Sequence, residues 1–208
     1  MSYVIALAGN PNCGKTTLFN ELTGSRQRVG NWPGVTVDKK EGTYKKNKEI
    51  LIMDLPGTYS LSPYSAEEVI ARDYIVMEKP DAVIDIVDAT SIERNLYLTL
   101  QILETGIPTV IALNMMDEVE ARGDKINAEK LSEILGVPVV PVTARKGKGV
   151  PELMAEAVET AKAKKAPKKL PIFDEKLDAA AAKIKEALDA AGEADSGWKA
   201  IKLLENDE

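Results

Sequence analysis

The chain has 208 residues, of which 44% are hydrophobic and 29% charged, as in a globular protein with one full-sized domain and a small appendage. The net charge of −6 gives no general attraction for phosphate backbones, so we expect no nucleic acid among the partners. One cysteine and no histidine exclude a disulfide framework and leave few ligands for a transition metal.

The apolar runs are short. None approaches the roughly 20 residues needed to cross a bilayer. The first residues enter a strand pattern directly and carry no basic leader, so nothing in them indicates secretion. We therefore expect this chain to be soluble and cytoplasmic.

Apolar, β-branched runs alternate with helical stretches, as in a parallel sheet wrapped by helices. The predicted buried strands are Val4–Ala8, Glu49–Asp54, Ala82–Val87, Thr109–Leu113 and Val137–Val142. The predicted helices are Lys15–Thr23, Ala66–Met77, Ile92–Glu104, Ala128–Leu135 and Pro151–Lys164. A charged, alternating stretch near Thr36–Tyr44 is predicted to be an edge strand, antiparallel to Glu49–Asp54.

The composition changes towards the C-terminus. Lys162–Lys169 is basic, contains a proline and has no apolar periodicity, which indicates a solvated helix end and a linker. The alternative is a surface that lies against anionic lipid. Beyond it, Phe173–Ala190 and Trp198–Leu204 have helical spacing but are too short to bury a core alone. We predict two units, residues 1–165 and a helical unit of residues 166–208 that packs on the first.

A phosphate-binding loop follows the first strand. Gly9-Asn-Pro-Asn-Cys-Gly-Lys-Thr16 lies between a strand and a helix, the context that such a loop requires. Its glycines let successive N–H groups point into one concavity. Lys15 places a positive charge on the β- and γ-phosphates, and the Thr16 hydroxyl is a ligand for Mg²⁺. The predicted nucleotide contacts in this segment are Gly9, Asn10, Pro11, Asn12, Cys13, Gly14, Lys15, Thr16 and Thr17.

This loop makes the fold class an α/β P-loop NTPase: a mostly parallel sheet flanked by helices, with one antiparallel edge strand and a small all-helical unit. Asp54 ends a buried strand, where such proteins use a carboxylate to hold Mg²⁺. Gly57 follows it and can offer its N–H to the γ-phosphate, so we predict that it senses whether that phosphate is present.

Asn114-Met115-Met-Asp117 ends the fourth predicted strand and indicates which base is bound. The Asp117 carboxylate can accept from N1–H and the exocyclic amine of guanine, a donor pair that adenine lacks. Asn114 is predicted to brace the loops around the base. The remaining base-contacting loop is predicted to contain Val142, Thr143 and Ala144, with the Ala144 N–H directed at guanine O6.

In this order, the four segments resemble the translation-factor-related class of small GTPases. Arg28–Gly42 and Asp54–Leu61 are similar to the corresponding segments of FeoB-type ferrous iron transport proteins, in their N-terminal cytosolic GTPase domain. Arg94–Leu98 extends the similarity, and Trp198–Glu205 resembles the helical segment between the GTPase and the membrane in that family. The resemblance covers nearly the whole chain.

The resemblance implies a GTP/GDP-binding domain that hydrolyses GTP with Mg²⁺. Thr36, in the segment with Gly34 and Val35, matches the threonine that completes the Mg²⁺ shell in the triphosphate state. Asn12 matches the asparagine that helps to hold K⁺ in potassium-stimulated GTPases; the alternative is that it only stabilises the turn. The implied catalytic residues are Lys15, Asn12, Thr36 and Gly57.

The resemblance also implies a partner. Hydrolysis releases the switch segments, and the helical unit relays this change to a membrane-embedded Fe²⁺ pore of the same polypeptide, outside this chain. The domain would then lie on the cytoplasmic face of the cell inner membrane. The sequence leaves the oligomeric state open, and oligomerisation is compatible with it.

Some positions depart from the wider GTPase class. Met115 stands where most relatives place lysine, and its side chain can cover the same face of the base. Thr58 stands in place of the water-orienting glutamine of signalling GTPases. Arg26 and Arg28 are candidate arginine fingers, with solvated loop charges as the alternative. We therefore predict slow intrinsic hydrolysis. A K⁺ ion beside Asn12 would supply part of the missing charge stabilisation.

Two other functions share these nucleotide loops. An RNA- or ribosome-associated GTPase of the Era or MnmE kind needs a basic surface that a net charge of −6 does not supply. A binding module could instead use GTP only as a regulatory ligand. Hydrolysis measured in K⁺ and in Na⁺ separates the enzyme from the ligand-only module.

Overall fold

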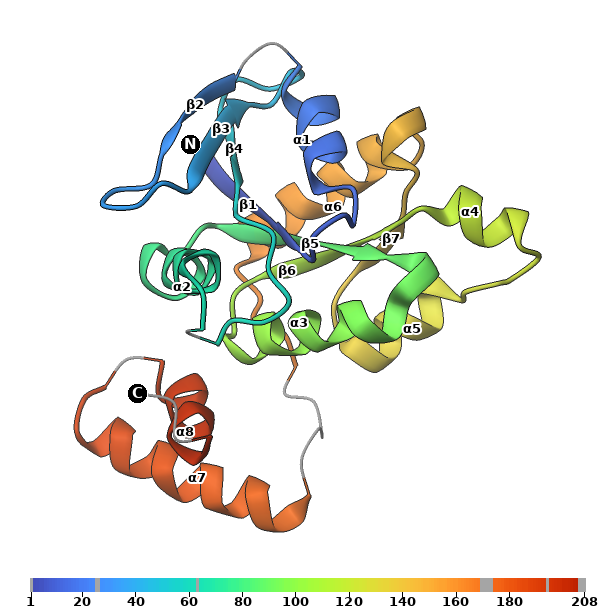
Figure 1. Ribbon diagram of the computed structural model, residues 1–208. Coiled ribbons are helices and arrows are strands. Elements are labelled where there is room, and N and C mark those ends of the chain that lie inside the picture. Colours follow the sequence, from blue (N-terminus) through green and yellow to red (C-terminus); the bar gives the residue numbers. More distant parts are fainter. Residues whose placement is uncertain (1, 25–26, 63, 169–173, 194, 206–208) are drawn as a thin grey trace.

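The computed structural model describes residues 2–24, 27–62, 64–168, 174–193 and 195–205. Its centre is a seven-stranded sheet with the strand order β2-β3-β4-β1-β5-β6-β7 (Figure 1). The strands are β1 (Tyr3–Gly9), β2 (Gln27–Asn31), β3 (Asp38–Thr43), β4 (Ile50–Asp54), β5 (Ala82–Asp88), β6 (Thr109–Asn114) and β7 (Val139–Pro141). β4, β1, β5, β6 and β7 pair in parallel, which confirms the predicted P-loop NTPase architecture.

The antiparallel edge contains one strand more than the sequence indicated. β3 pairs antiparallel with β4, as predicted, but β2 pairs antiparallel with β3 and forms the outermost strand. The side chains of β2 are largely exposed, and Val29 is 66% exposed. Because both faces of β2 are in solvent, its sequence has no alternation of apolar and polar residues, and the strand was not predicted.

Helices cover both faces of the sheet (Figure 1). On one face, α1 (Lys15–Thr23) and α6 (Val150–Ala163) pack over the apolar side chains of β1, β5 and β6. On the other face lie α2 (Ala66–Asp73), α3 (Ile92–Glu104), α4 (Met116–Ala121) and α5 (Ala128–Leu135). Short 3₁₀ turns, Ala89–Ser91 and Ala144–Lys146, precede α3 and α6. The central strands are therefore buried on both sides, which explains their continuous apolar runs.

Two helical details differ from the prediction. α2 begins with a capping box in which Ser65 and Glu68 each bond the other's backbone N–H, but the α-helix ends at Asp73. A π-helical turn, η1 (Tyr74–Glu78), continues it, where the sequence predicted one helix to residue 77. Such turns are rare and occur mostly at functional sites. α4 was not predicted, because six residues are too few to show helical periodicity.

The C-terminal part is helical, as expected. α7 (Glu175–Ala190) and α8 (Ser196–Leu204) pack on each other and lie beside the sheet unit in Figure 1. The predicted helix start at Phe173, like Lys169 of the basic stretch, lies outside the described residues. The predicted unit boundary at residue 165 stays a prediction. Within the described ranges, no helix has the length and apolar content that a membrane span requires.

Candidate nucleotide-binding site

The loop between β1 and α1 borders a hollow of about 580 Å³. Because parallel strands end on the same side of the sheet, the loop after β1 lies beside the loops that follow β4 and β6. The hollow is lined by Asn10, Pro11, Asn12, Gly14, Lys15, Thr16, Thr17, Gly57 and Met115. Most of the predicted phosphate-contacting residues therefore come together. Gly9 and Cys13 lie behind this lining, and Cys13 is buried.

Gly14 is required by the approach of Asn114. Its φ is +93°, and a Cβ atom there would lie 2.3 Å from Asn114 Nδ2. That Nδ2 donates to the backbone oxygen of Cys13 at 2.9 Å, and Asn114 Oδ1 accepts from the backbone N–H of Ala144 at 3.0 Å. The buried Asn114 side chain thus ties the phosphate-binding loop to the loop after β7, a geometry that agrees with its predicted bracing role.

The Lys15 ammonium lies 2.6 Å from Asp54 Oδ1. Both side chains are largely buried, with 11% of Lys15 and 5% of Asp54 exposed. The carboxylate compensates the charge of Lys15, and Thr16 presents a hydroxyl to the same hollow. Hydroxyl and carboxylate oxygens are the ligands that Mg²⁺ prefers, together with phosphate oxygens and water, so the residues fit that ion.

A second hollow of about 120 Å³ adjoins the first at Gly14, Thr17 and Met115. Asp117 lines it, together with Asn114, Glu118, Thr143, Ala144 and Arg145. Lys146 Nζ lies 2.8 Å from Asp117 Oδ2, and Arg145 lies 3.7 Å from the same oxygen. The hydrogen bond from Lys146 lowers the pKa of Asp117, so the carboxylate stays ionised and able to accept from a base.

In the loop after β7, the Ala144 N–H was predicted to contact guanine O6. The Ala144 N–H donates to Asn114 Oδ1, so it is engaged within the protein and does not point freely into the hollow. Its predicted bond to guanine O6 stays a prediction that requires this hydrogen bond to open or be shared. Val142 is buried in the core, and Thr143 is 4% exposed. The ion pair of Lys146 with Asp117 was not predicted. In the sequence, Lys146 is only a basic residue that closely follows the predicted base-contacting loop.

The predicted switch residues are divided. Gly57 lines the phosphate hollow, where a Cβ atom would lie 3.4 Å from Pro11. Gly34, Val35 and Thr36 lie in the exposed connection between β2 and β3, outside the linings of both hollows. Their roles around Mg²⁺ and the γ-phosphate stay predictions. The sequence alone does not reveal how far the connection between β2 and β3 lies from the phosphate hollow.

Thr58, which replaces the water-orienting glutamine, and the candidate arginine finger Arg28 both lie away from the phosphate hollow. Thr58 is 3% exposed and donates its hydroxyl to the backbone oxygen of Ser60. The Arg28 side chain is 88% exposed and lies 3.9 Å from Glu41, which agrees with a solvated loop charge. Arg26 lies outside the described residues. Neither Thr58 nor Arg28 reaches the phosphate hollow in this structure.

Comparison of the chain with known proteins identifies its family. Residues 3–157 match the family Ferrous iron transport protein B. The chain belongs to this FeoB family. It is 51% identical over 164 residues to the Fe(2+) transporter FeoB of Escherichia coli, an alignment that covers 76% of this chain and 21% of that protein. The chain thus spans about a fifth of that relative's length.

Solved FeoB structures share the fold. A crystal structure of an NFeoB mutant from S. thermophilus bound to mGDP superposes with a TM-score of 0.94 at 51% identity, covering 100% of this chain and 80% of that one. Another S. thermophilus NFeoB mutant, bound to GDP·AlF4⁻, has a TM-score of 0.87 and 52% identity, covering 100% of this chain and 81% of that one. The resemblance to FeoB and the fold class are both confirmed.

Proposed function

We propose that this chain binds GTP and GDP with Mg²⁺ and slowly hydrolyses GTP, as the cytosolic regulatory part of a ferrous iron membrane transporter. Residues 1–165 form the nucleotide-binding unit, and residues 166–208 form a helical unit that leads to the membrane part. The observation that carries this proposal is the bridge made by Asn114, which connects a loop built for phosphates to a loop built for guanine.

The charges and the relatives support phosphoryl transfer to water. Lys15 and the loop N–H groups would stabilise negative charge on the phosphates. Thr16 and Asp54 would hold Mg²⁺, which would supply further positive charge for phosphoryl transfer. Gly57, and Thr36 after movement of its loop, order the switch segments around the γ-phosphate. The GDP·AlF4⁻ complex of the S. thermophilus relative contains a group that stands in for the transferring phosphoryl.

The hydrolysis is expected to depend on K⁺. Asn12 is exposed and lines the phosphate hollow, so its amide oxygen could replace part of a K⁺ hydration shell. We expect single-turnover GTP hydrolysis to be about 10–100-fold faster in KCl than in NaCl, because the cation stabilises charge between the β- and γ-phosphates. Asn12→Ala is expected to abolish this difference while GDP affinity is retained.

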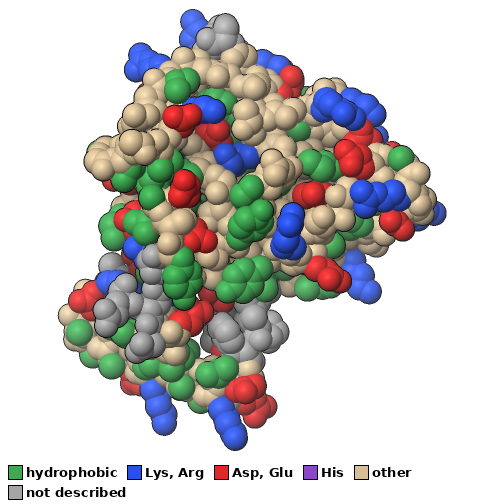
Figure 2. Space-filling model, in the orientation of Figure 1, with side chains coloured by type: hydrophobic (Ala, Val, Ile, Leu, Met, Phe, Trp, Pro, Cys, Tyr) green, Lys and Arg blue, Asp and Glu red, His purple; other side chains and the backbone are tan. Residues whose placement is uncertain are grey.

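The matched control is Asn47→Ala, in the turn between β3 and β4, which should leave the K⁺ effect unchanged. Equal and negligible rates in both salts would support the alternative in which GTP is only a regulatory ligand. The ribosome-associated alternative is not supported, since the family is FeoB. On the face seen in Figure 2, acidic and basic side chains are intermixed and form no basic stripe.

The relay to the helical unit is supported by contacts on both sides of α2 and η1. From the β2–β3 connection, Trp32 packs edge-on against Tyr74, with ring centroids 5.5 Å apart. From the other side, Val76 and Met77 share an apolar cleft of about 380 Å³ with Trp198 of α8. The exposed connection that carries Thr36 therefore touches the same segment as the helical unit.

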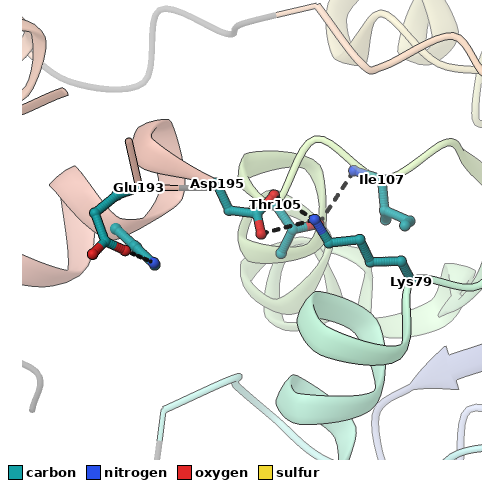
Figure 3. Close-up of polar contacts among 6 residues, drawn as sticks. Lys79, Thr105, Ile107, Glu193 and Asp195 are labelled. Carbon is teal, nitrogen blue, oxygen red and sulfur yellow. Dashed lines mark hydrogen bonds and ion pairs between the residues drawn. The ribbon is translucent and has the colours of Figure 1, made fainter. Parts of the chain in front are cut away.

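Figure 3 shows the polar part of this junction. Lys79, at the end of η1, points at Asp195, at the start of α8, and its Nζ lies 2.9 Å from Asp195 Oδ2. The Thr105 hydroxyl, at the end of α3, accepts from the Ile107 N–H at 3.3 Å. A displacement of α2 and η1 would therefore move both the apolar and the charged contacts of α8.

The two tryptophans of the chain make the relay measurable. In Trp32→Phe, Trp198 is the only tryptophan and reports on the helical unit. We expect its fluorescence to differ between the GDP state and the state with a non-hydrolysable GTP analogue. Adding Tyr74→Ala is expected to remove this difference at unchanged nucleotide affinity, because the aromatic ring kept at position 32 of the β2–β3 connection then has no ring on η1 to pack against.

Tyr97→Ala is the control for that experiment, since Tyr97 is 58% exposed on α3 and lies outside the contact. A nucleotide-dependent signal that survives Tyr74→Ala would rule out this route for the relay. A signal lost in both tyrosine variants would indicate a general effect on the fold.

A further inference from the structure

A buried polar cluster lies directly beneath the phosphate-binding loop. Asp85 of β5 is 1% exposed and stands opposite Ala8 in the β1–β5 register, one position before the level of Gly9, where the loop begins. Thr99 of α3 donates its hydroxyl to Asp85 Oδ2 at 2.5 Å. Neither residue takes part in the site described above, and Asp85 has no Lys or Arg partner among the described residues.

Asn10, from the loop itself, is another buried polar residue that faces α3. It is 2% exposed and faces the same helix, since its Nδ2 donates to the backbone oxygen of Arg94 of α3 at 3.5 Å. Its Oδ1 is buried and has no hydrogen-bond partner in the described part of the chain. Buried acceptors without a donor are rare and costly, so this loop residue is left with an unsatisfied polar atom on the side that α3 covers.

A carboxylic acid can supply a donor only when it is protonated. Burial raises the pKa of Asp85 to about 7, opposed by the hydrogen bond from Thr99, which favours the charged form. The charge of Asp85 also reaches the Cys13 thiol, which packs with Ile84 and Ile86 on the opposite face of β5; burial, and then the charge of Asp85, raise the pKa of this thiol to about 12. Lys15 lowers the pKa of that thiol and Asp88 raises it. From α3, the residue in contact with the Asp85 carboxyl group is Thr99.

We propose that Asp85 is a positioning residue that supports the phosphate-binding loop as a neutral acid, and that its ionisation weakens the binding of nucleotide phosphates. This inference rests on the nucleotide site proposed above. The neutral acid leaves no buried negative charge one register position from the start of the loop. A carboxylate in the same place adds a negative charge beneath the phosphates, where little water screens it.

The test compares the wild-type chain with Asp85→Asn, which keeps the shape but cannot ionise. GDP affinity in the presence of Mg²⁺ is measured by calorimetry from about pH 6 to about pH 8.5. We expect the ratio of wild-type to variant affinity to fall about tenfold over this range, as for a pKa that binding raises by about one unit. Taking the ratio removes the ionisation of the nucleotide's own groups, which affects both proteins equally.

Thr99→Val provides an independent variant, which also serves if Asp85→Asn does not fold. Without the hydroxyl, the carboxylate loses its one stabilising hydrogen bond, so the loss of affinity is expected to move to higher pH. An identical pH profile in wild type and Asp85→Asn would overturn the proposal, as would a fall that Thr99→Val moves to lower pH. If wild-type protein binds no guanine nucleotide at any pH, the proposed function itself fails.

Discussion

Asp117→Asn is expected to lower the affinity for GTP and GDP by about 10²–10⁴-fold. The carboxylate is placed to accept two hydrogen bonds from guanine, and each bond to a charged group contributes about 1.5–3 kcal/mol. An amide replaces one acceptor oxygen by a donor NH₂, which opposes the guanine amine but matches the 2-oxo group of xanthine. The variant is therefore expected to gain affinity for xanthosine nucleotides, which calorimetry with GDP and XDP measures.

Glu118→Gln is the matched control, because Glu118 follows Asp117 and lines the same hollow but has no proposed contact with the base. It is expected to retain the preference of the wild type for guanine. A variant Asp117→Asn that still prefers GDP to XDP would contradict the assignment of Asp117 as the residue that recognises the base.

Lys15→Met is expected to have two separate effects. Without nucleotide, it leaves the Asp54 carboxylate buried and unpaired, so the free energy of unfolding is expected to fall by about 3–5 kcal/mol. With nucleotide, it removes the ammonium that we propose contacts the phosphates, so GDP binding is expected to be lost. Urea denaturation measures the first effect and calorimetry the second.

The double variant Lys15→Met/Asp54→Asn separates these effects. It removes the unpaired charge, so most of the lost stability is expected to return while nucleotide binding stays absent. The control Lys45→Met removes a half-exposed ion pair with Glu21, and its effect on unfolding is expected to be within about 1 kcal/mol. Equal losses for Lys15→Met and Lys45→Met would contradict a buried pair at the phosphate loop.

Local features of the chain were readable without a structure. The segment Gly9–Thr16 is continuous, and its glycines, lysine and threonine act within one loop, so their order alone indicates phosphate binding. The parallel strands are buried on both faces and read as apolar runs. The predicted strands and most helices are therefore confirmed, apart from shifts of a few residues at their ends.

The features that the reading missed depend on surroundings rather than on local pattern. β2 is held by backbone hydrogen bonds to β3, with both faces in solvent, so its side chains carry no periodic signal. The end of α2 at Asp73 and the π-helical turn after it coincide with packing of Tyr74 against Trp32. That contact joins segments with no sequence relation to each other.

The sequence by itself determined the family, the α/β fold and the residue types of the nucleotide site, because these follow from short continuous segments. Only the tertiary structure decided which groups meet. It pairs Lys15 with Asp54 across 39 positions, joins Asn114 to Cys13 across 101, and places Asp85 beneath a loop whose motif does not contain it. Hydrogen bonds, charge pairing and burial act through space, and a linear pattern records only neighbours along the chain.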